Sequence, residues 1–180
     1  MVQFKAIVPW VEVNGAAVLS VIEGMEQFRN KALKILEKHG ISDPKRDRWY
    51  SQQAWLDAFR EISEQIGPAT LEAIGKKIPD TALWPPNVNT IEEALASIDI
   101  AYHYNHRRGE IGNYRFEKTG ETSATVTCDN PYPCAFDLGI IKATAAKFAS
   151  GRVIPSVRED SSRPCRRKGG NSCTYIVTWV

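Results

Sequence analysis

Apolar residues recur at helical spacing through most of the first half of the chain. Asn14 can cap a helix that runs toward Gly40, because apolar side chains repeat every three or four residues between them. A polar loop at 42–48 follows, and behind it a second amphipathic stretch carries the apolar positions Trp55, Phe59, Ile62 and Ile66. The pattern therefore predicts one helix over 14–40 and another after residue 50.

Two further helices are predicted before the middle of the chain. Residues 71–77 form a short third helix that ends near Pro79, and the stretch 84–87 contains two prolines that favour an irregular turn. Thr90 then caps a fourth helix, because Glu93 stands three residues later in a capping-box pattern. We expect this helix to end near Arg108 and Gly109.

The pattern changes from helical to alternating after residue 112. Two strands flank a turn at 118–120, a helix covers 138–148, and a second strand pair spans 153–157 and 174–179. The C-terminal part thus reads β-β-α-β-β. We predict an α+β fold in which N-terminal helices pack on an antiparallel sheet. The expected organisation is a single ligand-binding domain over 1–180, mainly helical over 1–108 and β-β-α-β-β over 109–180.

Composition narrows the function classes. The chain has 23 Lys and Arg against 21 Asp and Glu, a formal net charge of +2, which is too balanced to favour nucleic acid or an anionic membrane. It contains no apolar run long enough for a membrane span, and its start lacks the pattern of a secretory signal. We therefore expect a cytoplasmic protein, in which the four cysteines are thiols or metal ligands rather than disulfides.

The four cysteines are the first candidate site. They are spaced as C-x5-C and C-x7-C, wider than the usual zinc knuckle, and comprise Cys128, Cys134, Cys165 and Cys173. A zinc ion prefers four such ligands, so the set predicts a metal site with zinc expected ahead of haem. The alternative is that they are small buried apolar residues. Cys128 alternates with Val126 and fits that alternative best, whereas the other three lie beside turns.

A second candidate site lies where the fourth helix meets the first strand. His103 and His106 are three residues apart and could converge on a metal or haem iron, or could instead interact with the helix C-terminus. The glycines and charges that follow could bind a polar ligand head or form a plain turn. The ligand-binding residues that we expect here are Tyr102, His103, His106, Arg107 and Tyr114.

Other motifs are less informative. The basic segment 163–168 could hold an anion, but a solvated loop is the favoured interpretation because aromatic residues are not interleaved. The sequence has no GxSxG, phosphate loop, GxGxxG or HExxH motif. Its tryptophans fit core positions or the lining of a pocket for a hydrophobic ligand. We expect no catalytic role from these patterns.

The C-terminal segment resembles the 4-vinyl reductase-like small-molecule-binding domains. The residues that carry this resemblance are Asn130-Pro131-Tyr132-Pro133-Cys134 before a helix, then Cys165, and Gly169-Gly170-Asn171-Ser172-Cys173 before the last strand. That family shares a ligand-binding superfamily with haem nitric-oxide sensor domains and TRAPP subunits. The chain departs from the family pattern at Asn171, where the family often has Asp, and in having only Glu159 or Asp160 upstream of Cys165.

The resemblance implies a non-catalytic binding or sensor domain for a small hydrophobic or pigment-like molecule, with the cysteines as metal ligands. Two alternatives stay open. One is an enzyme or accessory factor that acts on a tetrapyrrole-like molecule, in which Cys134 or the two histidines would supply the chemistry. The other is an interaction module that forms a homodimer through its N-terminal helices, as the TRAPP relatives imply.

Overall fold

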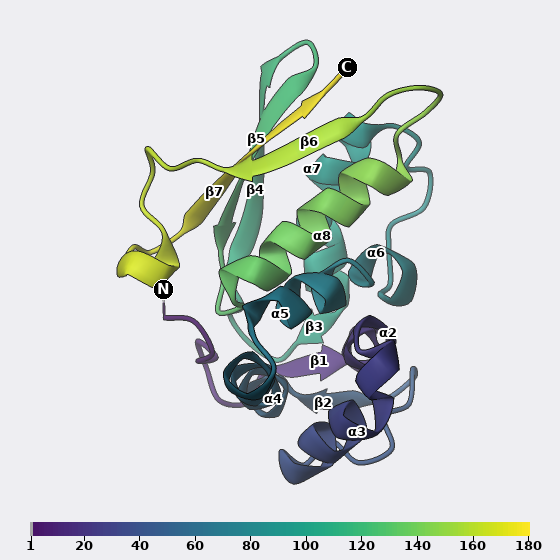
Figure 1. Ribbon diagram of the computed structural model, residues 1–180, viewed down its shortest axis with the longest axis vertical. Coiled ribbons are helices and arrows are strands. Elements are labelled where there is room, and N and C mark those ends of the chain that lie inside the picture. Colours follow the sequence, from purple (N-terminus) through teal and green to yellow (C-terminus); the bar gives the residue numbers. More distant parts are fainter. Residues whose placement is uncertain (1) are drawn as a thin grey trace.

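The structure, a computed structural model, describes residues 2–180 and has an α+β fold (Figure 1). Helices lie on one side of a four-stranded antiparallel sheet, and a small three-stranded sheet lies at the other end of the molecule. The prediction of an α+β fold with N-terminal helices, an antiparallel sheet and a C-terminal β-β-α-β-β order is confirmed.

The sheets have simple topologies. The larger has the order β4-β5-β7-β6, all neighbours antiparallel, with the bounds β4 (Asn113–Gly120), β5 (Ser123–Asp129), β6 (Pro155–Glu159) and β7 (Cys173–Trp179). The smaller has the order β2-β1-β3, with β1 (Glu12–Asn14), β2 (Trp49–Ser51) and β3 (His106–Arg107). Its strands of two or three residues were not predicted, because such short segments show no alternation.

The longer helices after residue 50 fall near the predicted positions, with shifted ends, whereas the segment before residue 40 is divided. They are α1 (Gly15–Val18), α2 (Ser20–Gly24), α3 (Arg29–Lys38), α4 (Gln52–Gln65), α5 (Pro68–Gly75), α6 (Ile78–Thr81), α7 (Ile91–Tyr104) and α8 (Cys134–Lys147). Two short 3-10 turns, η1 (Glu26–Phe28) and η2 (Arg166–Lys168), complete the set in residues 2–180. None of these helices is long and apolar enough to cross a membrane.

The single helix predicted over 14–40 is wrong, since the segment is divided into α1, α2, η1 and α3. The break after Gly24 has a packing reason. A Cβ atom at Gly24 would lie 2.5 Å from the Cα atom of Ile74, so α2 approaches α5 through a residue that also weakens a helix. Helix α7 ends before the predicted Arg108, because the side chain of Asn105 donates to the carbonyl groups of Ala101 and Leu83.

Helix α8 lies across one face of the larger sheet and packs on α5 (Figure 1). The two helices approach closely through glycines: a Cβ at Gly75 would lie 2.1 Å from the Phe136 carbonyl oxygen, and one at Gly139 would lie 2.2 Å from that of Glu72. The start of α8 at Cys134, four residues before the predicted 138, follows Pro133 directly. The contact between α5 and α8 places the first turn of α8 against the core.

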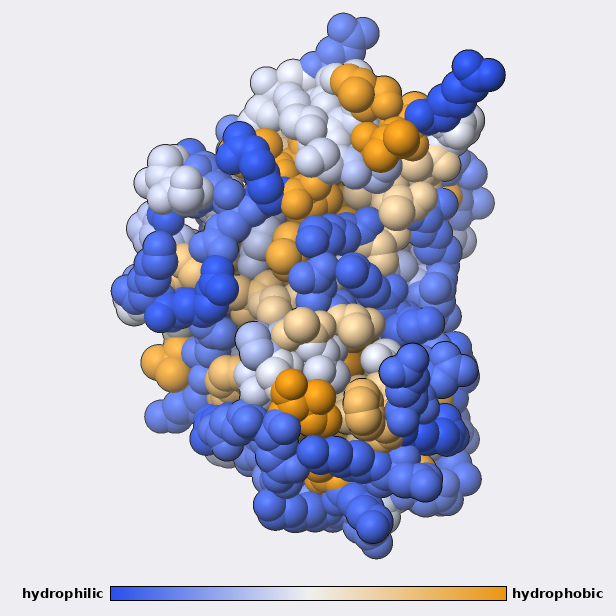
Figure 2. Space-filling model, in the orientation of Figure 1, coloured by the Kyte–Doolittle hydropathy of each residue, from blue (hydrophilic) through white to orange (hydrophobic). Residues whose placement is uncertain are grey.

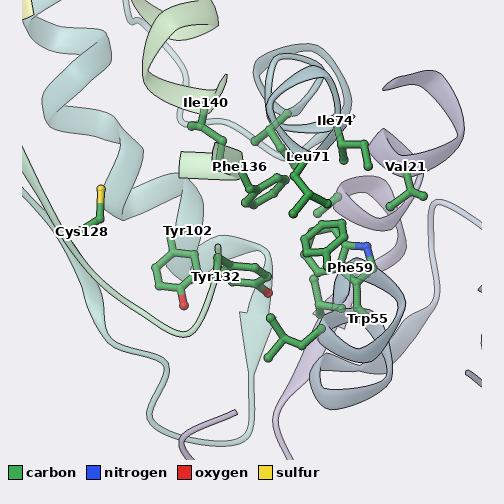
Figure 3. Close-up of a cluster of buried hydrophobic side chains, with 14 of the residues drawn as sticks. Val21, Trp55, Phe59, Leu71, Ile74, Tyr102, Cys128, Tyr132, Phe136 and Ile140 are labelled. Carbon is green, nitrogen blue, oxygen red and sulfur yellow. The ribbon is translucent and has the colours of Figure 1, made fainter. Parts of the chain in front are cut away.

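An aromatic cluster fills the centre of the molecule (Figure 3). Trp55 and Phe59 from α4 meet Tyr132 and Phe136 from the start of α8, with ring centroids 4.7–6.2 Å apart in tilted or edge-on arrangements. On the face shown in Figure 2, hydrophilic side chains cover most of the surface and apolar ones form separate patches.

Candidate functional site

A small apolar cavity lies between α7, α4 and the start of α8. Its volume is about 40 Å³, and its lining is almost entirely apolar and aromatic, including Trp55, Trp84, Tyr102, Tyr114, Tyr132 and Phe136. Figure 3 shows Tyr102 beside Tyr132, with Phe136 above Tyr132 and Trp55 to its right. Side chains from widely separated parts of the chain thus line one space.

His106 is one of the side chains with polar atoms that line this cavity. Its Nδ1 lies 2.7 Å from the Tyr102 carbonyl oxygen, which can only accept, so Nδ1 carries the proton. Nε2 is therefore an acceptor for the Tyr132 hydroxyl at 2.6 Å, and Gln52 Nε2 donates to the same hydroxyl oxygen at 3.2 Å. Desolvation lowers the pKa of His106 to about 4, so the imidazole is neutral at physiological pH.

Polar atoms without partners lie in or next to this lining. The indole N–H of Trp84 and the side-chain oxygen of Gln52 are buried and have no hydrogen-bond partner. A buried N–H without an acceptor costs about 1–3 kcal/mol, so a bound acceptor atom would recover part of that cost. Trp84 belongs to the segment between α6 and α7, which the backbone N–H and carbonyl of Leu83 tie to the side chain of Asn105.

The predicted ligand-binding residues divide into two groups. Tyr102, His106 and Tyr114 line the cavity. His103 is half-exposed on α7 and bonds to Asp99, so the two histidines do not share a site.

Arg107 lies outside the lining as well, because it pairs with Glu12 at 2.5 Å and stacks on the Trp49 ring with its Cζ 4.4 Å from the centroid. The sequence did not single out Tyr132 or Gln52 for this site. From the sequence, Trp84 and Trp55 could be assigned to this site only through the general observation that tryptophans often line apolar pockets.

A buried ion pair lies beside the cavity. The carboxylate of Asp137 accepts from the Tyr114 hydroxyl at 2.5 Å and from the guanidinium of Arg166, and both charged side chains are fully buried. Arg166 also donates to the carbonyl and side-chain oxygens of Asn130. Burial is the largest single effect and opposes the charge on Arg166, but the Asp137 carboxylate and the neighbouring cysteines together outweigh it and raise the pKa of that guanidinium. The prediction of a solvated basic loop is therefore wrong for Arg166.

Three of the four predicted metal ligands meet in a second place. The Sγ atoms of Cys134 and Cys173 are 2.9 Å apart, those of Cys165 and Cys173 are 3.3 Å apart, and those of Cys134 and Cys165 are 3.7 Å apart. All three are buried and free of disulfides. We call these three residues the thiol cluster. Cys128 lies outside it, on the buried face of β5.

Local backbone geometry holds the thiol cluster together. Gly169 adopts φ 82°, in the left-handed region that favours glycine, and turns the chain back so that Gly170 N–H donates to the Cys165 carbonyl. The backbone N–H of Arg166 donates to the Cys173 sulfur at 3.2 Å. The hydrogen bond from the Cys134 thiol is the main cause that lowers the pKa of Cys173, and Arg166 adds to it against the opposing effect of burial.

The fold shows which class of protein domain this chain resembles in structure. It is the fold of H-NOX domains. No protein-family model matches the chain, and no curated protein matches it either.

Three solved structures illustrate the likeness. An H-NOX protein from S. oneidensis in the Fe(II)NO ligation state has a TM-score of 0.66, is 12% identical, and the match covers 93% of this chain and 99% of that one. An oxygen-binding H-NOX domain related to soluble guanylate cyclases has a TM-score of 0.65 at 12% identity, over 92% and 94% of the two chains. Unliganded Fe(II) H-NOX from K. algicida has a TM-score of 0.60 at 14% identity, over 93% and 96%.

These neighbours correct one expectation. We placed zinc ahead of haem as the cofactor, yet the structural neighbours are H-NOX domains of the haem-binding type, crystallised in Fe(II) states. The order zinc before haem is therefore wrong as an inference about this fold. The prediction of zinc rested on the spacing of the cysteines, and a local ligand pattern carries no information on the cofactor that a fold family binds.

Proposed function

We propose that this chain is a non-catalytic sensor domain that binds a small, uncharged, largely apolar molecule in the cavity beside His106. The observation that carries the proposal is the polar group at one side of an apolar space: the His106–Tyr132 hydrogen bond, with the unpartnered indole N–H of Trp84 in the same lining. Apolar walls with a few polar anchors are the usual composition of small-molecule sites.

The cavity restricts the chemistry of this ligand. Its polar groups are neutral, because His106 is unprotonated and Tyr132 keeps its proton through a pKa that burial raises. A charged ligand would therefore find no counter-charge in the lining, whereas one oxygen acceptor would satisfy Trp84. A volume of about 40 Å³ has room for a few waters at most. A ring-sized ligand therefore requires the segment between α6 and α7, which carries Trp84, to move outward.

The H-NOX neighbours suggest haem as a ligand for this chain. The interior of this chain does not fit haem. Sites for cofactor-sized ligands measure about 300–1,000 Å³, against about 40 Å³ here. Aromatic rings fill the space, and Nε2 of His106 already accepts from Tyr132. His103, the other histidine on this side, is half-exposed and bonded to Asp99. We therefore assign no function to haem in this chain.

The finer expectations stay proposals. Membership of the 4-vinyl reductase-like group, a pigment-like ligand, a homodimer and a cytoplasmic location rest on the sequence resemblance and composition alone. The enzyme alternative would need a reactive group at the cavity. Neutral His106 and protonated Tyr132 are engaged with each other there, which favours binding over catalysis.

A matched set of probes tests the proposal. Toluene, para-cresol and benzoate share a ring and differ in having no oxygen, a neutral hydroxyl and a carboxylate. We expect cresol to bind best, benzoate not at all, and Trp84→Phe to weaken cresol about fivefold while leaving toluene unchanged, because one hydrogen bond is worth about 1 kcal/mol. Calorimetric titration measures this, with Trp10→Phe, an exposed tryptophan, as control. Equal binding of benzoate and cresol would contradict the proposal.

A further inference from the structure

We propose that the thiol cluster of Cys134, Cys165 and Cys173 captures one trivalent thiophilic ion, of the arsenic(III) or antimony(III) class, through three sulfur bonds. The cluster shares no lining residue with the cavity beside His106, so this site is separate from the proposed sensor function. Its three sulfurs converge from α8, the turn before η2 and β7, all at distances of 2.9–3.7 Å from one another.

The number of ligands favours a three-coordinate ion. Within residues 2–180, no histidine or carboxylate joins the three thiols as a further ligand atom. An ion that prefers a tetrahedron would have to take its fourth ligand from outside this group, as a water for example. Glu159, an acidic side chain on the adjoining wall, is engaged with Arg167 in an ion pair.

The spacing of the sulfurs points the same way. A tetrahedral centre with bonds of about 2.3 Å sets its sulfurs about 3.8 Å apart. Every Sγ–Sγ distance in the cluster is shorter than that, from 2.9 to 3.7 Å. A pyramidal trivalent centre has bond angles close to a right angle because its lone pair occupies one side, and it therefore brings its three sulfurs closer together.

The charge balance of the surroundings favours a neutral product. The two cations next to the cluster are each paired with a carboxylate, Arg166 with Asp137 and Arg167 with Glu159. A divalent ion on three thiolates would leave a net negative charge in this buried place, and an unpaired buried charge is costly. A trivalent ion on three thiolates is neutral and carries no such cost.

The binding step balances with arsenous acid as the ligand form. Three As–O bonds break and three As–S bonds form, and each leaving hydroxide takes one thiol proton and departs as water. Where Cys173 is already a thiolate, solvent supplies that proton. No oxidant or reductant is needed, because arsenic stays trivalent and each sulfur stays at the thiol level.

The ion also has a route to the cluster. A surface cleft of about 210 Å³ is lined by Cys134 together with Tyr175, Glu159 and Arg167. Cys134 and Cys165 each keep 3% of their surface exposed, whereas Cys173 has none. The uncharged hydroxide form of arsenic(III) can therefore reach Cys134 first and then exchange onto the two deeper sulfurs.

The experiment uses the full reduced chain with sodium arsenite as probe. Native mass spectrometry counts arsenic atoms and lost hydrogens, and near-ultraviolet absorbance reports sulfur-to-arsenic charge transfer. We expect one arsenic per chain with the loss of three hydrogens, and loss of this species in Cys134→Ser, Cys165→Ser and Cys173→Ser. Cys128→Ser is the matched control, because it removes a buried thiol outside the cluster, and it should bind arsenic as the native chain does.

A protection assay on the native chain keeps the test valid if a serine variant fails to fold. Alkylation under slow unfolding should spare the three cluster cysteines when arsenite is present and modify Cys128 in either case. Three outcomes would overturn the proposal: an adduct that lost only two hydrogens, loss of binding in Cys128→Ser, or displacement of arsenite by an equal concentration of zinc. The last outcome would assign the site to a tetrahedral ion.

Discussion

Protonation of His106 should make this protein less stable in mild acid. The imidazole is bonded on both nitrogens and enclosed by Tyr102 and Tyr132, with ring centroids at 4.5 and 5.8 Å. Its pKa falls from 6.5 in the unfolded chain to about 4 in the folded one. Between these values the unfolded chain binds more protons, so the free energy of unfolding increases with pH in this range.

The magnitude follows from the shift. A change of 2.5 pKa units, the difference between 6.5 and about 4, corresponds to about 3 kcal/mol at 1.36 kcal/mol per unit. Because the side chain is only partly buried, we discount this to about 2 kcal/mol. The contribution is fully present above pH 6.5 and is lost as the pH falls toward 4.

Urea unfolding at a series of pH values between these limits measures the effect. His106→Gln should remove about 2 kcal/mol from the change in unfolding free energy across this interval, because glutamine does not titrate. His103→Gln is the matched control, since His103 is half-exposed on α7 and should leave the pH dependence unchanged. The reasoning is refuted if His106→Gln keeps the native pH dependence, or if His103→Gln abolishes it.

Three further predictions concern stability, each measured by urea unfolding at neutral pH. Arg166→Met should cost about 3–5 kcal/mol because it leaves the Asp137 carboxylate buried and unpaired, and the double variant with Asp137→Leu should recover much of this loss. Equal destabilisation of the single and double variants would contradict it. Gly75→Ala should cost about 1–3 kcal/mol, because its Cβ would lie 2.1 Å from the Phe136 carbonyl oxygen; no loss would mean that α5 and α8 separate freely. Thr90→Ala should cost about 1 kcal/mol by removing the capping box of α7, and Thr90→Ser should keep it.

Local interactions made several elements predictable. Thr90 caps α7 with Glu93 in the capping box that the sequence showed, and the alternation at Ala124, Val126 and Cys128 gave the buried face of β5. These signals extend over only a few residues, so tertiary contacts do not alter them. Where tertiary contacts do dominate, the prediction failed: the helix expected over 14–40 breaks at Gly24, where α2 meets α5.

In the candidate site, too, the residue types were predictable from the sequence, and the long-range contacts were not. The sequence indicated Tyr102, His106 and Tyr114 as ligand-binding residues, and those three line the cavity. It could not indicate the partner of His106, because Tyr132 is 26 residues away and only the packing of α7 on the segment before α8 brings them together.

What the sequence by itself determined about this protein is therefore its α+β class, most of its elements and the residue types available for binding. The tertiary structure decided which of them meet. Cys134 reaches Cys165 across 31 residues, and Arg166 reaches Asp137 across 29, while Cys128 remains apart. The physical reason is that helix caps and strand alternation are local, whereas the convergence of side chains depends on how α8, η2 and β7 pack, which involves the whole core.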